Sequence, residues 1–231
     1  MDANFFLVSR LDLITSFYRQ GAAPFLATMA AITDETGDYA NPPYSEDSEP
    51  PYQLEWEQAQ TCLLLLGATC ISSLAGALQV FLDTLVQEHG DQAKLKTYAM
   101  KDGWWAMHQR YFAAHGLDLA NSGADVGLLT DVVLARNSVQ HPKSLTSDRA
   151  SYRDDDLKKL KRPFFLSEEE AAVLNGTGSK ISSYLFQATI EVDEAKLEVA
   201  VGEMKKLGHW LQHSIWEQKA DEYQERKRSA Q

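Results

Sequence analysis

The segment LARNSVQHP, residues 134–142, places an arginine and a histidine five positions apart, followed by a proline. The planar guanidinium fork of Arg136 can bind two oxygens of a phosphate group at once. The imidazole of His141 titrates near neutral pH, so it can donate or accept a proton in the same site. Together these side chains supply the groups that phosphodiester cleavage needs when no metal ion takes part.

The sequence predicts a helix over residues 124–140 that carries the arginine. With Val126 at 0° and each residue advancing by about 100°, Arg136 falls at about 280°, within an apolar arc. The arc is formed by Leu128, Leu129, Val132, Val133, Ala135 and Val139. A charge on an apolar face costs free energy unless an anion pairs with it. We therefore expect Arg136 to face a groove within or between subunits, with His141 nearby.

The same helix should end beside the histidine. Pro142 disfavours the α conformation for the residue before it, so the helix is expected to stop at about Gln140. His141 would then lie at the negative end of the helix dipole, which favours the protonated imidazole. Asn137 and Ser138 add polar groups at this helix end, and we expect them to support the arginine and the histidine.

Charge is distributed unevenly along the chain, whose formal net charge is −11. Residues 1–90 contain 2 basic and 12 acidic residues, whereas residues 136–162 contain 8 basic and 4 acidic residues, a net charge of +4. A polyanion should approach the second region and be repelled by the first. We therefore assign RNA binding to Lys143, Arg149 and Arg153, in a small and focused site.

The motif RNSVQH, Arg136 to His141, resembles the R-x4-H signature of the HEPN superfamily, in which a polar residue, often Asn, follows the arginine. The resemblance implies a helical-bundle core over about residues 54–145, with the other segments as decoration. It also implies a metal-independent endoribonuclease, of the kind found in toxin–antitoxin and anti-phage defence systems. One subset of HEPN toxins carries R-x4-H-x-Y, and this chain has Lys143 at the tyrosine position. Regulation through that tyrosine is therefore not expected here.

The expected reaction is RNA cleavage by transesterification. A base removes the proton of the 2′-hydroxyl group, the oxygen attacks the adjacent phosphorus, and an acid protonates the departing 5′ oxygen. The guanidinium would stabilise the crowded phosphorane. One chain supplies a single Arg136–His141 pair, so a two-fold homodimer with facing helix ends would supply both an acid and a base. The expected partners are RNA, a second copy of the chain and, from the resemblance, a protein antitoxin. No cofactor and no metal are expected.

Two other interpretations of the motif stay open at this point. The chain could be a HEPN-like domain without catalysis that binds a nucleotide or a protein partner. It could also be a structural helical protein, in which Arg136 pairs with a carboxylate such as Asp131 or Glu57.

The chain as a whole is predicted to be a single domain over residues 1–231 with a mainly α, HEPN-like bundle fold. Its other helices are predicted over residues 4–33 with a break near Pro24, 54–88, 95–115 and about 193–226. A short β element is expected within residues 162–192, because the segment 183–192 contains strand-forming residues. Ser167 and Glu170 have the spacing of a capping box, and Asp193 is expected to cap the last helix.

The most apolar segment, residues 61–82, contains no charged residue over 22 positions. Its length would suffice to cross a bilayer. However, acidic residues flank both ends, and its small and polar residues gather in one stripe at helical spacing. The stripe consists of Thr69, Ser72, Ser73, Gly76 and Gln79. We therefore predict the buried central helix of a bundle, approached closely by another helix at the stripe, and no membrane span.

Both cysteines, Cys62 and Cys70, lie in this apolar segment. They are expected to pack as free thiols, which suits a reducing compartment. The N-terminal residues lack the basic segment of a signal peptide, so a cytoplasmic location is expected.

Three residues of the last predicted helix have the one-turn spacing of a metal site: His209, His213 and Glu217. Trp210 and Trp216 accompany them, and packing or surface positions are the simpler interpretation. No metal site is predicted.

Overall fold

The structure is a computed structural model that describes residues 1–42, 50–89, 95–98, 103–141, 149–160, 162–167, 169–172 and 188–229. The chain is mainly α, as predicted. The helices are α1 (Ala3–Thr33), α2 (Gln53–His89), α4 (Gly103–Ala114), α5 (Val126–Gln140), α6 (Asp154–Leu157) and α8 (Glu194–Ser229). Short 3-10 turns are η1 (Gly37–Tyr39), η2 (Lys96–Tyr98) and η3 (Leu119–Ser122), and residues 169–172 are also helical.

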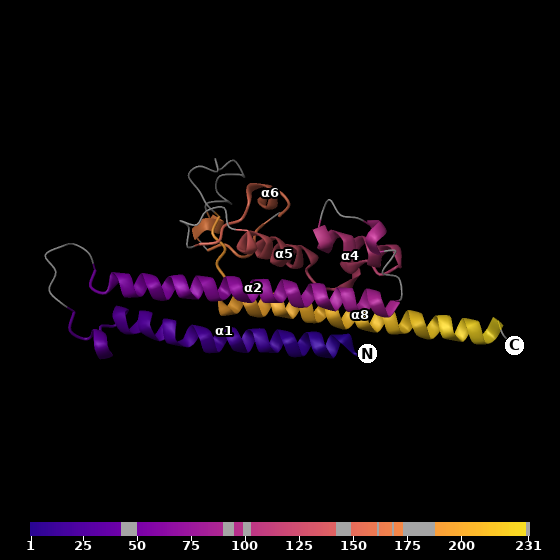
Figure 1. Cartoon of the computed structure of the whole chain (residues 1–231), viewed down its shortest axis with the longest axis horizontal. Helices are drawn as coiled ribbons and strands as arrows, with labels where there is room; N and C mark the ends of the chain where they lie inside the picture. The colour runs from indigo at the N-terminus through magenta and orange to yellow at the C-terminus, as the bar shows by residue number, and fades with distance from the viewer. Residues whose placement is uncertain are drawn as a thin grey trace.

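Three long helices, α1, α2 and α8, run side by side, and the shorter helices lie over the other side of α2 (Figure 1). Helix α2 is central, since it contacts α1, α5 and α8. The buried apolar side chains of all these elements form one core. The predicted central position of this helix is therefore confirmed.

Aspartates start three of the helices by accepting a hydrogen bond from the first turn. Asp2 Oδ1 accepts the Phe5 N–H at 3.0 Å, and Asp125 Oδ1 accepts the Leu128 N–H at 3.0 Å. The predicted cap of the last helix is also present, because Asp193 Oδ1 accepts the Lys196 N–H at 2.7 Å. These caps fix where α1, α5 and α8 begin.

Two predicted helices differ from the structure. Helix α1 continues through Pro24 without the expected break. Pro24 lies on the exposed side of α1, where water can reach the backbone carbonyl that loses its partner. The helix predicted over 95–115 is divided into η2 and α4, with residues 99–102 outside the described part. Gly103, with a φ of 84°, begins α4, and Gly116, with a φ of 78°, follows its end.

The short β element expected within residues 162–192 can be compared with the structure only in its described residues. Within the described residues it consists of one antiparallel bridge between Ser151 and Thr189. The segment is still held on both sides by backbone hydrogen bonds, from Ile190 N to Ala150 O and from Glu191 N to Phe165 O, both at 2.8 Å. Residues 183–187 of the predicted strand lie outside the described part of the chain.

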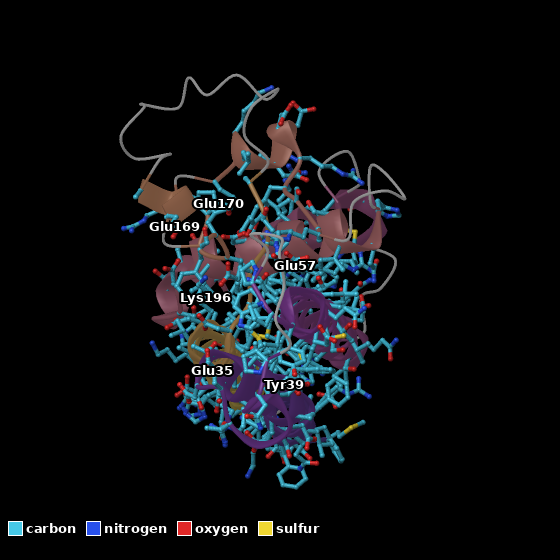
Figure 2. All side chains as sticks on the ribbon, turned by 90° about the vertical axis from the view of Figure 1, so that its left-hand side faces the viewer. Glu35, Tyr39, Glu57, Glu169, Glu170 and Lys196 are labelled. Atoms are coloured by element: carbon cyan, nitrogen blue, oxygen red, sulfur yellow. The ribbon has the colours of Figure 1, made fainter. Side chains whose placement is uncertain are left out.

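Side-chain hydrogen bonds also hold this region in place (Figure 2). Ser167 Oγ accepts the Glu170 N–H at 3.1 Å, as the capping-box spacing predicts, but the Glu170 carboxylate accepts the Thr189 N–H instead of closing the box. Lys196 Nζ donates to Leu166 O at 2.7 Å and to Glu191 O at 3.2 Å. The first turn of α8 thus fastens two loop segments to the bundle.

Helix α2 is long and apolar enough to cross a membrane by length and composition, and 44% of its most apolar 18-residue window is buried in the structure. The two cysteines on this helix are free thiols, and Cys70 is buried.

The predicted close approach at the small-residue stripe of α2 is wrong within the single chain. A Cβ placed on Gly76 would have no described atom within 4 Å, and Thr69 and Ser73 are exposed. The close approach is instead at Gly67, where a Cβ would lie 2.4 Å from Val192 O. An extended segment, rather than a helix, therefore uses the missing side chain of Gly67.

We expect Gly67→Ala to lower the free energy of unfolding by about 1–3 kcal/mol, because the added methyl group overpacks this contact. The matched control is Gly202→Ala in α8, where a Cβ would have no described atom within 4 Å. There alanine should raise helix stability by about 0.5–1 kcal/mol. Denaturant unfolding of both variants measures the difference. A Gly67→Ala protein as stable as the wild type would show that the 188–192 segment does not pack tightly on α2.

Candidate active site at the end of α5

Helix α5 ends where the sequence predicts. His141 is its C-cap, with a φ of −128° and a ψ of 67°, and its backbone N–H donates to Asn137 O at 3.2 Å. The His141 side chain is exposed. An exposed imidazole therefore marks the helix end, at the negative pole of the helix dipole.

Arg136 lies one turn before this end and is half-buried. The apolar residues of its arc are buried around it, except for the half-buried Val139. Its Nη1 donates to the side-chain oxygen of Asn137 at 3.0 Å, which is the supporting role predicted for that residue. Among the described residues, no carboxylate forms an ion pair with Arg136.

The two carboxylates considered as structural partners of Arg136 are engaged elsewhere. Asp131 accepts hydrogen bonds from the Tyr152 hydroxyl and from the Phe164 N–H. Glu57 Oε1 accepts from Gln53 Nε2 at 2.7 Å. Neither pairing therefore explains the arginine on the apolar face of α5.

Ser138, the second predicted supporting residue, is buried on the same helix turn as Asn137. Its hydroxyl has no hydrogen-bond partner among the described residues. A buried hydroxyl without a partner costs free energy. It is therefore open to a new partner at this helix end.

The three basic residues assigned to RNA binding do not lie together in the structure. Arg153 Nη2 donates to the His141 carbonyl oxygen at 3.5 Å, the long limit of a hydrogen bond, so this guanidinium lies at the end of α5. Arg149 Nη2 instead lies 3.4 Å from Gln60 Oε1 on α2, in the wall of a large cavity. Lys143 lies outside the described residues. Arg153 is thus the predicted cation that the structure brings to His141.

A buried hydrogen-bonded cluster that the sequence did not reveal positions Arg153. Asp131 on α5 is 1% exposed and accepts from Tyr152, the neighbour of Arg153 in the chain. Burial raises the pKa of Asp131 to about 6, and the hydrogen bonds from Phe164 and Tyr152 oppose that rise. Burial and the adjacent carboxylate raise the pKa of Tyr152, so its hydroxyl keeps the proton that it donates. The signal for this cluster in the sequence was Asp131 itself, a single acidic residue within an apolar helix.

A second buried polar contact joins α2 to α4. His108 is fully buried, with Nδ1 2.8 Å from Trp104 O and Nε2 3.1 Å from Asp83 Oδ1. The two ring nitrogens therefore join the Trp104 carbonyl of α4 to the Asp83 carboxylate of α2. His108 is thus a packed core residue that fastens α4 to α2.

The histidines on α8 are surface residues. His213 Nε2 lies 3.1 Å from Glu217, and both side chains are more than 60% exposed. The His209 and His213 rings stack with centroids 6.3 Å apart. Across the described ranges, no group of three His, Cys, Asp or Glu residues is arranged to hold a metal ion.

Comparisons of the chain with protein-family models, with curated proteins and with solved structures gave no match. The function is therefore inferred from the side chains at the end of α5.

Proposed function

We propose that this chain is a metal-independent endoribonuclease of the HEPN type, acting as a two-fold homodimer. The observation that carries the proposal is the position of Arg136, a half-buried residue on the apolar face of α5. This residue has no described carboxylate as a counter-ion and lies one turn before the exposed His141. A desolvated cation without an anion is costly unless a ligand supplies the anion. The phosphodiester of RNA fits this requirement.

Each side chain then has a role in the reaction. His141 exchanges the protons, since its ring is exposed at the end of α5, where a substrate can reach it. Arg136 stabilises the negative charge of the phosphorane, held in position by Asn137. Arg153 attracts the backbone of the strand to the end of α5. The P–O5′ bond breaks, and the products carry a 2′,3′-cyclic phosphate and a 5′-hydroxyl.

The biological setting follows from the same proposal. A ribonuclease of this type acts in the cytoplasm as a toxin or in anti-phage defence, and a protein antitoxin would hold it in check. The high negative charge of residues 1–90 agrees with a focused RNA site rather than binding over the whole surface.

The experiment that tests the proposal is incubation of the purified chain with single-stranded RNA in the presence of EDTA, followed by analysis of the product ends. Cleavage that persists in the chelator and leaves 2′,3′-cyclic phosphates supports the proposal. RNA that stays intact over a broad range of pH and salt overturns it, and a non-catalytic binding domain becomes the better account.

Exposed apolar side chains on α1 and α2 offer a surface for a second copy of the chain, and this surface does not include Arg136 or His141. Along α1 and α2 they include Phe6, Leu13, Phe17, Leu65 and Val80. A groove of about 320 Å³ between the two helices is lined partly by these residues. The open small-residue stripe of α2 lies beside them, so a second copy has both an apolar surface and room for close approach.

We expect sedimentation to show a dimer at tens of micromolar, a concentration that a weak but specific interface can populate. Gly76→Arg should shift the protein to monomer, because the long charged side chain would project from the stripe into the partner. The open space at Gly76 means that the same change leaves the folded chain intact, which circular dichroism can verify. A wild type that is only monomeric at this concentration would contradict the dimer.

A further inference from the structure

A cavity of about 760 Å³ lies where the end of α1 and the beginning of α2 meet, away from the α5 helix end. Its wall includes three aromatic residues, Tyr39, Tyr52 and Trp56, and two carboxylates, Glu35 and Glu57. Figure 2 faces this end of the bundle, with Glu35 and Tyr39 near α1 and Glu57 on α2. The volume is in the range of sites that hold a small organic molecule.

The aromatic part of the wall is built by α2 and η1. The Tyr39 and Tyr52 rings meet edge to face, with centroids 4.9 Å apart. Trp56 follows one turn after Tyr52 and donates its backbone N–H to the Tyr52 carbonyl at 3.0 Å. All three rings are half-buried, so each keeps surface that a ligand can contact. The negative faces of such rings attract cations, and tryptophan does so most strongly.

The charge around the cavity is mostly negative, which suits a cationic ligand. The described residues of this stretch, 34–42 and 50–57, contain five acidic residues and no basic residue. Arg149 is the one cation in the described wall, and its guanidinium is directed to Gln60 Oε1 at 3.4 Å. An anionic ligand would meet Glu35 and Glu57, whereas a cation would be attracted by both.

The backbone at the cavity is also unusual. Glu35, with a φ of 51°, and Tyr52, with a φ of 58°, are the residues other than glycine with positive φ in the described chain, and both line this cavity. Such conformations are uncommon for residues with a side chain and gather at ligand sites. The fold therefore holds a glutamate and a tyrosine of the wall in place against local preference.

We propose that this cavity binds a small organic cation whose charge is carried by an alkylated ammonium group. Methyl groups on nitrogen spread the charge and lower the cost of leaving water, so the group packs against Tyr39, Tyr52 and Trp56. Glu35 and Glu57 neutralise the charge. This site is independent of the proposed ribonuclease chemistry at α5.

Two calorimetric titrations of the full chain test the proposal. One uses choline, and the other uses its neutral isostere, in which a carbon atom replaces the nitrogen. Choline should bind at millimolar or lower concentration, and the isostere should bind about tenfold more weakly or not at all. Equal binding of the two compounds, or no binding of choline at millimolar concentration, overturns the proposal. Binding of a trimethyllysine peptide without binding of choline overturns the assignment to a small molecule.

Variants test the wall itself. Trp56→Leu should weaken choline binding about tenfold, whereas Trp56→Phe, which restores an aromatic face, should recover most of it. Glu57→Gln should weaken binding and reduce its dependence on salt. Trp216→Leu on α8, an exposed tryptophan far from the wall, is the matched control and should bind as the wild type does. Unchanged binding by both Trp56→Leu and Glu57→Gln, with native circular dichroism, overturns the site.

Discussion

His141→Ala should slow RNA cleavage by about 10²- to 10⁴-fold, because the variant loses the side chain that transfers protons. Arg136→Ala should slow it by about 10²- to 10³-fold, the scale of losing one electrostatic donor to the transition state. Neither change should unfold the protein. His141 is exposed, and removal of the half-buried Arg136 charge relieves a desolvation cost. Rates on single-stranded RNA in EDTA, together with thermal unfolding curves, measure both effects.

A matched control is His209→Ala on α8, which removes an exposed histidine that lies outside the proposed site. It should cleave RNA at the wild-type rate. If His141→Ala and Arg136→Ala also cleave at that rate, any nuclease activity of the preparation comes from another site or another protein. The R-x4-H motif would then have no catalytic role.

The second large effect concerns stability and pH at Asp131. Its folded pKa of about 6 lies above the ordinary value of 3.8, so the folded chain binds more protons than the unfolded chain between these values. Stability contributed by protonated Asp131 is therefore fully present below about pH 4 and is lost as the pH rises through 6. The shift of about two units corresponds to about 3 kcal/mol in the free energy of unfolding.

The measurement is denaturant unfolding of the wild type and of Asp131→Asn from pH 4 to pH 7. Wild-type stability should fall by up to about 3 kcal/mol relative to the variant as the pH rises, since asparagine does not titrate. Asp221→Asn, at an exposed position on α8, is the control and should run parallel to the wild type. Parallel curves for the wild type and Asp131→Asn would mean that the buried carboxyl group does not titrate in this range.

Stability and the candidate site are connected through this residue. Asp131 holds Tyr152, and Tyr152 precedes the arginine that contacts the end of α5. We therefore expect the position of Arg153 to depend on a hydrogen bond made inside the core. This connection could not be derived from the spacing of the R-x4-H motif.

Local chemistry in the sequence determined the helices and their ends. Asp125 and Asp193 cap the helices that follow them, and α5 ends at Gln140 as the sequence predicts, because these effects act within one helical turn. The helical phase placed Arg136 among buried residues for the same reason. The break near Pro24 was predicted wrongly because the cost of an internal proline depends on whether that side of the helix faces water or protein.

Only the tertiary structure decided which groups meet. The sequence alone gave no reason for Asp131 to pair with Tyr152 rather than with Arg136, nor for Arg149 to reach α2 while Arg153 reaches His141. Helical spacing likewise marked the small-residue stripe of α2, but it could not show that Gly67 meets Val192 while Gly76 stays open. Such contacts join residues far apart in the chain, so they depend on the packing of whole helices and loops. Local propensity and spacing specify the elements; the arrangement of those elements in space selects the partners.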